Sequence, residues 1–389
     1  MHVLIVATER FVPVEDPVSG IFQYHQAFAL HRAGVKVGVL APAPLTVRSI
    51  FKRAKRDRYE EFPFPVSVNR RLTLCPGRFT ALMQSMWSRT AEKMLSDYVD
   101  RHGRPDLLHA HNAVFAGICC CYLAERTGIP YVITEHSSAF STGSVCSTDT
   151  LREAYRKACA RIMVSPFLGS KVEAAIGKDA VPWSFIPNFL EPRFSVQRIS
   201  PQAVDRTFRF LCVAQFVPIK NHAGLIQAFA SAFGGQNVEL ALGGSGELLE
   251  ATRALADSCG VSKQVKFLGM LSRDEVIAQM HGCDVLVLPS FSETFGVVLI
   301  EALACGKPII APSGSGCEAI VNRENGLLFK PGNVKELAQA MVKMVDSAFA
   351  YDTQAIRHDC LSRFGEAAVV ALMLRTYKEA LSNFSRARK

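Results

Sequence analysis

Residues 284–301 read D-V-L-V-L-P-S-F-S-E-T-F-G-V-V-L-I-E, and this stretch decides the fold. An apolar run with strand character comes first, and the Pro-Ser pair at 289–290 interrupts it. Residues 296–304 then have the apolar spacing of a helix. The stretch therefore predicts a strand, a loop and a helix, with Glu293 on the loop and Glu301 just over one turn into the helix.

The chemistry of this stretch suits a ligand that has both an anionic group and hydroxyl groups. In an open α/β sheet, ligands bind at the carboxyl ends of the strands, and the free N–H groups of a following helix attract phosphate. Backbone amides after Gly296 would hold a diphosphate, while the carboxylates of Glu293 and Glu301 accept hydrogen bonds from sugar or ribose hydroxyls. The stretch thus predicts a nucleotide-sugar pocket.

Strand-like runs alternate with helix-length segments along the whole chain of 389 residues, which is long enough for two domains. The expected strands lie at 3–7, 35–40, 107–109, 131–134 and 161–164, and then at 208–214, 238–242, 265–268, 284–288 and 308–311. This alternation predicts two doubly wound parallel sheets. Prolines and polar residues between 187 and 207 mark the expected domain boundary.

The spacing of Glu293 and Glu301, with Phe295-Gly296 between them, resembles the E-x7-E signature of retaining glycosyltransferases of family 4. The resemblance covers nearly the whole chain. It implies the GT-B fold, an α/β architecture in which two Rossmann-like doubly wound domains face each other across a cleft. It also implies an acceptor-binding domain at 1–190, joined by a C-terminal helix at 366–389, and a nucleotide-sugar donor-binding domain at 207–365.

A second motif lies at residues 213–222, which read V-A-Q-F-V-P-I-K-N-H and resemble the family's G-R-L-x-x-x-K-G element. The resemblance implies that the Lys220 ammonium neutralises a leaving diphosphate. Gln215 stands where the family often has an arginine that helps to bind the diphosphate. Donor binding is therefore expected to depend more heavily on Lys220.

Glycine-rich loops complete the resemblance. Residues 243–247, G-G-S-G-E, resemble the family's G-x-G-x-x loop, where small residues such as Gly244 let the backbone approach the nucleotide. Residues 312–318 would shape the edge of the nucleotide pocket, and N-G-L-L-F at 325–329 is expected to form a turn that closes the second domain. In the first domain, Ser19-Gly20 resembles the glycine-rich loop after the first strand, so the Gly20 amide would reach the donor phosphates or the acceptor.

Three histidines lie at the expected ends of two strands in the first domain. His109 and His111 form an H-x-H pair whose rings turn to one face of a strand, without the further ligands and spacing of a zinc site. His136 occupies the position of the family histidine that contacts the donor sugar. The resemblance therefore selects His136 as a site residue, with weaker support for His111.

The resemblance also assigns the remaining roles. Glu301 would hold the ribose, Glu293 the hydroxyls of the donor hexose, and Lys220 with the backbone of Phe295-Gly296-Val297 the diphosphate. Each contact serves charge that grows on the leaving group. The acceptor hydroxyl would attack from the side that the nucleotide leaves, with a donor phosphate oxygen taking the proton, so Glu293, His136 and Lys220 are the expected catalytic residues.

No D-x-D sequence is present, the motif with which the other major glycosyltransferase fold binds a divalent metal. The expected reaction is therefore independent of metal and needs no cofactor, with a UDP- or GDP-sugar as co-substrate. A Walker A sequence, a complete G-x-G-x-x-G at the first strand and a G-x-S-x-G elbow are also missing from the sequence, which disfavours kinases, dehydrogenases and serine hydrolases.

The net charge of +9 is concentrated between residues 48 and 78, where nine basic residues face three acidic ones and aromatic side chains are interleaved. This segment is either a solvated basic loop or a surface for an anionic membrane or a phosphorylated acceptor. A nucleic-acid partner is not expected, because no known binding module appears. The twelve cysteines lack any C-x-x-C pair and no stretch is long and apolar enough to span a membrane. A cytoplasmic protein is expected, and it would be peripheral on the inner membrane face if the basic segment contacts a membrane.

The acceptor expected from the family's usual work is a saccharide or lipid-linked saccharide of a cell-surface polysaccharide. Two other functions stay open. A non-hydrolysing sugar-nucleotide epimerase would use the same fold and one substrate. A non-catalytic nucleotide-sugar binding protein would explain Gln215, although the presence of Glu293, Glu301 and Lys220 argues against it.

Overall fold

The computed structural model describes residues 1–7, 21–42, 62–69, 81–145, 148–177, 182–196, 207–347 and 350–387. The chain divides into two compact units. Unit 1 comprises Met1–Val164, Leu168–Ile186 and Val370–Lys389, and unit 2 comprises Ser165–Phe167 and Pro187–Val369. The division of acceptor and donor binding between the two halves of the chain stays a prediction.

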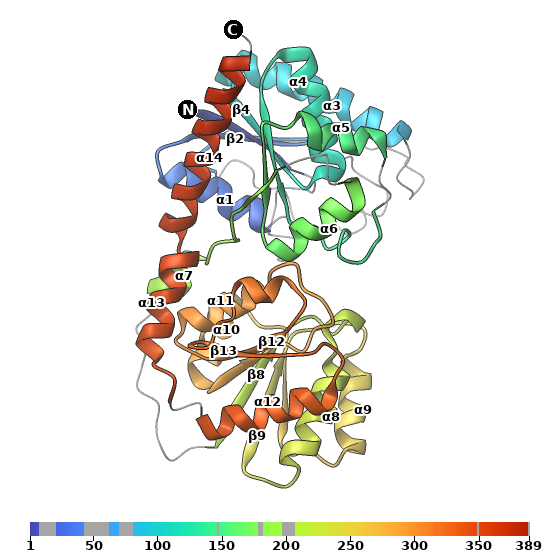
Figure 1. The fold of residues 1–389 in the computed structure, drawn as a ribbon, viewed down its shortest axis with the longest axis vertical. Helices are drawn as coiled ribbons and strands as arrows, with labels where there is room; N and C mark the ends of the chain where they lie inside the picture. The colour runs from blue at the N-terminus through green and yellow to red at the C-terminus, as the bar shows by residue number, and fades with distance from the viewer. Residues whose placement is uncertain are drawn as a thin grey trace. The chain divides into compact units, whose positions relative to one another are not determined.

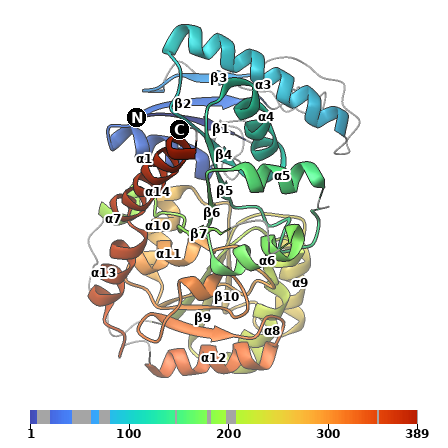
Figure 2. The same ribbon diagram turned by 45° about the horizontal axis from the view of Figure 1, so that its top comes forward.

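Unit 1 contains a parallel sheet of seven strands in the order β3-β2-β1-β4-β5-β6-β7, and Figure 2 shows the strand labels in this succession. The strands are β1 His2–Val6, β2 Lys36–Ala41, β3 Val66–Val68, β4 Leu107–His111, β5 Tyr131–Glu135, β6 Ala160–Met163 and β7 Ser184–Phe185. The helices are α1 Ile21–Arg32, α3 Ala81–His102, α4 Ile118–Thr127, α5 Asp149–Lys157, α6 Pro166–Ile176 from Leu168 on, and α14 Glu366–Ala387 from Val370 on.

Unit 2 contains a parallel sheet of six strands in the order β10-β9-β8-β11-β12-β13. The strands are β8 Phe208–Val213, β9 Val238–Gly243, β10 Val265–Gly269, β11 Val285–Val287, β12 Ile309–Pro312 and β13 Gly326–Phe329. The helices are α7 Pro192–Val196, α8 His222–Phe233, α9 Leu249–Ser258, α10 Arg273–Gly282, α11 Val297–Ala304, α12 Val334–Ser347 and α13 Thr353–Phe364, with short 3₁₀ turns at Pro218–Lys220 and Gly316–Ala319.

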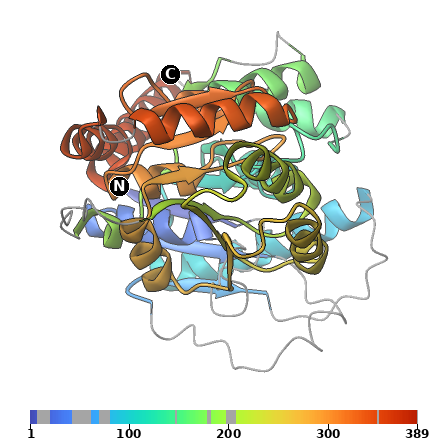
Figure 3. The same cartoon turned by 90° about the horizontal axis from the view of Figure 1, so that it is seen from below.

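Both sheets are buried where the sequence is continuously apolar, as in parallel sheets covered by helices on both faces. In β1 the residues from Val3 to Val6 are fully buried, and in β11 all three residues are buried. In unit 2, α8 packs against α12, which Figure 3 shows as the orange-red helix. These contacts confirm the doubly wound α/β fold that the alternating pattern predicts.

Both sheets reverse their strand order once. In unit 1 the chain runs from β1 outward through β2 to β3 and then resumes at β4 on the other side of β1. In unit 2 it runs from β8 outward to β10 and resumes at β11 on the other side of β8. A doubly wound sheet binds ligands at the carboxyl ends of its strands beside this switch point. The loops after β4, β8 and β11 are therefore where this topology favours a ligand site.

The C-terminal helix α14, Glu366–Ala387, lies within the expected range of 366–389 and belongs to unit 1 from Val370 on. In Figure 1 the red helix α14 runs beside α1. Gln26 of α1 donates hydrogen bonds to Met373 Sδ (3.2 Å) and Tyr377 Oη (3.4 Å) of α14. Tyr377 is fully buried. Residues 370–387 thus help to complete the core of the unit that begins at Met1.

Some expected elements differ from the structure. Of residues 325–329, for which the resemblance implies a turn, Asn325 lies in a turn, whereas 326–329 form strand β13, paired with β12. Short strands β3 and β7 at the sheet edge were not expected, because two or three residues give too little alternation to detect. The described cysteines are free thiols, most of them buried. Among the described residues, no helix combines the length and apolarity needed to cross a bilayer.

Candidate functional site

In unit 2 the loops after β8 and β11 meet at the carboxyl edge of the sheet. The backbone N–H of Phe291 donates to the carbonyl of Ile219 (2.9 Å), and the Asn221 side chain donates to the carbonyl of Pro289 (3.2 Å). Asn221 adopts a left-handed conformation (φ 51°) and caps α8 by accepting a hydrogen bond from Gly224 N. These bonds join two loops that are adjacent in space because β8 and β11 are paired.

The joined loops bring Lys220 and Glu293 into contact. Lys220 Nζ donates to Glu293 Oε1 at 2.6 Å, and Ser290 Oγ donates to the same oxygen at 2.7 Å. The Glu293 side chain is 11% exposed and the Lys220 side chain 25%. The structure thus brings these two predicted site residues into contact, with the carboxylate more buried than the ammonium.

Helix α11 begins beside this pair. Gly296 precedes its first residue, Val297, with φ 95°, a left-handed conformation that favours glycine. A Cβ at Gly296 would also approach the Cys317 sulfur (3.3 Å). Phe295 is 1% exposed and packs edge-on against Phe364, so its ring belongs to the core and anchors the loop before α11. The first N–H groups of a helix have no partner within the helix, and here they start next to Glu293.

The loop after β9 runs against the loop after β8. Gly244 has φ 136°, and a Cβ there would overlap the carbonyl oxygen of Ala214, so no other residue fits without a shift. Phe216 N donates to Ser245 O (2.9 Å), which fixes the two loops to each other. Gln215, on the loop after β8, is exposed. At Gly244 the close backbone contact is with Ala214 of the protein itself, and contact with a nucleotide stays a prediction.

Glu301 lies in the second turn of α11 and is 4% exposed. Its Oε1 accepts a hydrogen bond from Arg273 Nη2 at the start of α10, and Arg273 Nε donates to Glu191 Oε2 at 2.8 Å. Burial raises the pKa of Glu301, and the Arg273 guanidinium opposes this shift. Sequence reasoning missed Arg273, although Ser272-x-x-Glu275 is a capping box that places the residue at a helix start after a strand.

In unit 1 the rings of the three histidines form a row between the rings of Phe22 and Tyr377. The ring of His136 stacks on Phe22 and on His111, with centroid distances of 5.3 and 5.2 Å. His111 Nδ1 and His136 Nε2 are 3.1 Å apart, and the His109 ring lies 4.6 Å from the His111 ring. His109 forms hydrogen bonds with Thr134 Oγ1 and with Tyr377 Oη, both of 2.7 Å.

The two inner histidines are neutral near pH 7. His109 and His111 are 0% and 2% exposed. Burial lowers the pKa of His109 to about 3, with a smaller contribution from the nearby His136. Burial also lowers the pKa of His111 well below its ordinary value, and both neighbouring histidines add to the shift. Only His136 of the three is partly exposed, so it is the one placed to touch a ligand.

Glu135, which sequence reasoning missed, fixes the loops around His136. Its Oε2 accepts hydrogen bonds from Ala113 N (2.9 Å) and Tyr155 Oη (2.8 Å), and its Oε1 accepts one from Ser137 N (2.9 Å). The carboxyl group is fully buried, and burial raises its pKa against the effect of these donors. Glu135 thus joins the loop after β4 to the loop after β5.

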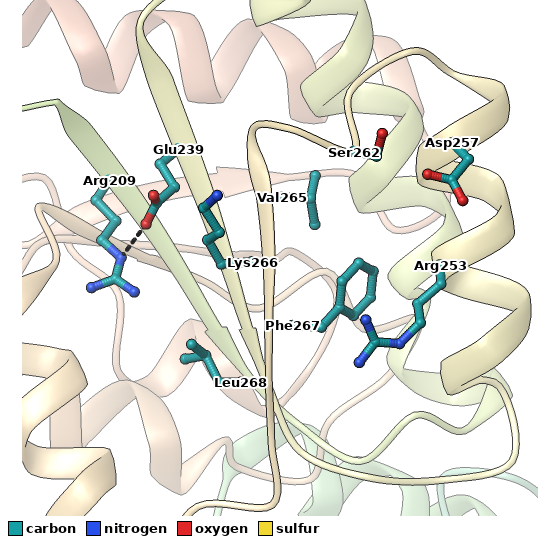
Figure 4. A pocket seen from close by; sticks show the side chains of 9 residues that line it. All are labelled: Arg209, Glu239, Arg253, Asp257, Ser262, Val265, Lys266, Phe267 and Leu268. Atoms are coloured by element: carbon teal, nitrogen blue, oxygen red, sulfur yellow. Dashed lines mark ion pairs between the residues drawn. The ribbon is translucent and has the colours of Figure 1, made fainter.

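A pocket of about 600 Å³ in unit 2 lies elsewhere. Figure 4 shows its lining, in which Arg209 and Glu239 form an ion pair (2.8 Å) and Arg253 lies over the Phe267 ring (4.4 Å). Arg209, Glu239 and Lys266 are each the second residue of their strand, so the pocket lies at the amino ends of β8, β9 and β10. It is at the opposite edge of the sheet from Lys220 and Glu293.

The structure thus groups the predicted site residues in two places. In unit 2 Lys220 contacts Glu293, which lies on the loop before α11, and Glu301 lies within α11. In unit 1 His136 stands at the carboxyl end of β5. Gly20 and most of the basic segment 48–78 lie outside the described residues, so their predicted roles stay predictions.

Comparison with solved structures identifies the fold. Sucrose-phosphate synthase from Thermosynechococcus elongatus matches 98% of this chain and 100% of its own, with a TM-score of 0.77 and 20% identity. Anabaena Alr3699/HepE in complex with UDP matches 97% of this chain and 100% of its own, with a TM-score of 0.72 and 21% identity. With its two parallel α/β units, the chain is a protein of the GT-B class.

Sequence comparison then gives the family. The family model described as Glycosyltransferase Family 4 matches residues 20–194, and the one described as Glycosyl transferases group 1 matches residues 195–357. The putative teichuronic acid biosynthesis glycosyltransferase TuaC of Bacillus subtilis is 25% identical over 349 residues, covering 84% of this chain and 85% of TuaC. The chain belongs to the family-4 glycosyltransferases, which confirms the resemblance drawn from Glu293 and Glu301.

Proposed function

We propose that this glycosyltransferase moves a hexose from a UDP- or GDP-sugar to a saccharide or lipid-linked saccharide, with retention of the anomeric configuration and without a metal. The main observation in favour is the Lys220–Glu293 pair (2.6 Å) beside the start of α11, at the switch point of the unit 2 sheet. This arrangement offers a cation, a carboxylate and helix N–H groups within one small area.

The three groups match the parts of a nucleotide sugar. Lys220 and the first N–H groups of α11 suit the diphosphate, whose charge increases as the bond to the sugar breaks. Glu293 accepts hydrogen bonds from hexose hydroxyls, and Glu301 accepts them from the ribose. The UDP bound by Alr3699/HepE, which has the same fold, supports a nucleoside diphosphate as part of the donor.

The reaction then needs no protein side chain as general base, because the donor itself can take the proton. The acceptor hydroxyl attacks the anomeric carbon on the face that the nucleotide leaves, the carbon–oxygen bond to the diphosphate breaks, and a phosphate oxygen takes the acceptor proton. His136, as a partly exposed ring held by Phe22 and His111, hydrogen-bonds the donor sugar. Lys220 supplies the positive charge that a metal supplies elsewhere.

Lipid-linked acceptors would bring the protein to an anionic membrane. The first turns of α3 follow the basic segment 48–78 and expose Leu82 (70%) and Met86 (41%), with Arg89 and Lys93 further along the same helix. Apolar and basic side chains on one exposed helix suit a bilayer surface. Failure of the protein to bind anionic liposomes at low salt would exclude this contact and leave the transferase proposal intact.

The deciding experiment is a calorimetric screen of UDP, GDP and ADP and their hexose conjugates with EDTA present, using wild type, Glu293→Gln, Lys220→Ala and the control Lys266→Ala. Binding of one nucleotide by wild type and the control, weakened in Lys220→Ala, supports the proposed pocket. The conjugate that binds is then incubated with candidate acceptors, and NMR reads the anomeric configuration of the product.

Three outcomes would contradict the proposal. Inversion at the anomeric carbon would exclude the retaining route. Conversion of the sugar nucleotide without an acceptor would favour an epimerase. Tight nucleotide binding without any turnover, in the presence of the acceptors tried and of added divalent metal, would favour a binding protein.

A further inference from the structure

The Arg273 side chain lies between two carboxylates that come from distant parts of unit 2. It donates through Nη2 to Glu301 on α11 and through Nε to Glu191, which precedes α7. Its guanidinium also lies 4.8 Å from the centre of the Phe194 ring. The Glu191 and Glu301 side chains are 10% and 6% exposed, whereas that of Arg273 is 35% exposed. The cation is thus the most accessible member of a largely buried cluster.

Local helix electrostatics do not favour an arginine here. Arg273 is the first residue of α10, where the helix dipole disfavours a positive charge and favours an acidic one, as at Asp274 and Glu275. The two carboxylates offset this effect. The arginine's position is therefore explained by its contacts with Glu191 and Glu301 and not by helix stability.

The contact has two effects on Glu301. Burial alone would favour the protonated form of this carboxyl group, and the guanidinium favours the ionised form. The bond also occupies Oε1, so that Oε2 is the oxygen left to accept from a ligand. An ionised oxygen makes a stronger hydrogen bond to a hydroxyl group than a neutral carboxyl does.

We propose that Arg273 is a positioning residue for donor binding, which orients the ionised Glu301 so that Oε2 accepts from a ribose hydroxyl. The proposal rests on the function proposed above, in which Glu301 holds the ribose. Glu191 in turn holds Arg273 by the bond to Nε. The three residues thus set how strongly the protein distinguishes ribose from deoxyribose.

Other ionisable groups near Glu301 do not replace Arg273. Cys305 follows the same helix, and its thiol pKa is raised to about 12 by burial, so it is neutral. On α13, the Cys360 thiol pKa is also raised to about 12, and the Arg357 guanidinium donates to backbone carbonyls of Ala304, Phe194 and Ser195. Glu191 raises the pKa of Glu301. Removing Arg273 therefore leaves Glu301 beside a second carboxylate, without a paired cation.

The test measures the affinity of the full chain for UDP and GDP and for their 2′-deoxy and 3′-deoxy analogues between pH 5.5 and 8. We expect Arg273→Ala to reduce the ribose-over-deoxyribose preference about tenfold at pH 7 and to make affinity fall as the pH is lowered, with Arg273→Lys between it and wild type. In a Glu301→Gln background the same substitution should change affinity little. Arg193→Ala is the matched control, because Arg193 pairs with Glu191 and Asp274 and not with Glu301.

If wild type binds the nucleotide and Arg273→Ala keeps the same ribose preference, the proposed role of Arg273 is wrong, and the proposed function is unaffected. An equal loss of affinity in the Glu301→Gln background would show that Arg273 acts independently of Glu301 and would also overturn the proposed role. If wild type binds neither nucleotide, the proposed function fails together with this inference. Thermal unfolding of each variant separates loss of binding from loss of folding.

Discussion

At the carboxyl edge of the unit 1 sheet, the buried His109 and His111 are neutral and hydrogen-bonded, whereas at the same edge of the unit 2 sheet cations and carboxylates are paired. Burial lowers the pKa values of His109 and His111, and neighbouring histidines add to both shifts. Lys220 with Glu293, and Arg273 with Glu301, form ion pairs. The same sheet topology thus carries neutral hydrogen-bonded groups in one unit and ion pairs in the other, because different residues occupy the strand ends.

The difference matches the two halves of the proposed reaction. A diphosphate is charged and its charge grows during transfer, so a cation and helix N–H groups belong on its side. Sugar and acceptor hydroxyls are neutral, so an imidazole such as that of the partly exposed His136 can bind them through hydrogen bonds. The predictions below test whether the two edges differ in this way.

The largest effect is expected from Lys220→Ala, which removes the cation from the unit 2 edge. Because the charge on the leaving diphosphate is greatest in the transition state, kcat/KM should fall by about 10²–10³-fold. Steady-state kinetics with the donor found in the screen measures this. Lys266→Ala, at the amino edge of the same sheet, should be unchanged, and a similar loss in both variants would rule out a specific role for Lys220.

The next effect concerns Glu135, a buried carboxylate at the unit 1 edge. Glu135→Ala leaves Ala113 N, Ser137 N and the Tyr155 hydroxyl without their acceptor, which should lower the free energy of unfolding by about 3 kcal/mol. Urea unfolding followed by circular dichroism measures the change. Tyr155→Phe removes only one of the three bonds and should cost about 1 kcal/mol, so equal costs in the two variants would contradict the assigned role.

The neutral state of His109 predicts a pH dependence of unit 1. Its pKa is about 3 in the folded protein and about 6.5 in an unfolded chain, so the unfolded state binds more protons between these values. The contribution of His109 to the free energy of unfolding is fully present above pH 6.5 and falls as the pH decreases toward 3. The slope reaches at most about 1.4 kcal/mol per pH unit.

Hydrogen exchange of unit 1 peptides, compared between wild type and His109→Gln, measures this slope. The difference between the two proteins is the informative quantity, because the raised pKa of Glu135 gives a dependence of opposite sign above pH 4.5. Equal slopes in both proteins would mean that His109 is not held neutral.

The smallest effect is expected from Gln215→Arg, which adds a cation at an exposed position of the unit 2 edge. A second positive charge should tighten nucleoside diphosphate binding by about 1 kcal/mol at low salt and by less at high salt. Calorimetry at two salt concentrations, with Gln215→Lys as a second variant, measures this. Tighter binding that is insensitive to salt would point to a change in loop structure and not to charge.

The sequence predicts local structure at the site well and contacts between distant segments poorly. Residues 284–301 form the expected strand, loop and helix, because apolar periodicity and the Pro-Ser break are local signals. The resemblance placed Lys220 and Glu293 in one pocket, but their direct bond depends on two loops joined by backbone hydrogen bonds. Arg273 was missed because its partners, Glu191 and Glu301, are distant in sequence, and only the paired strands and helices bring them together.

Errors in the fold have similar causes. The resemblance implies a turn at residues 325–329, yet residues 326–329 lie beside β12 in the fold and pair with it in parallel. The roles of Glu135 and His111 depend on the adjacency of β4 and β5, which a sequence pattern does not specify.

The return of α14 to unit 1 reverses the order in which the protein is completed during synthesis. Apart from three residues, unit 2 is one continuous segment that ends at Val369, so its sheet is complete while the last part of the chain is still being made. Tyr377, whose hydroxyl bonds His109 at 2.7 Å, leaves the ribosome afterwards. Domains usually fold in the order of synthesis, N-terminal first. Here the N-terminal unit receives α14 only after every strand of the unit 2 sheet has been made.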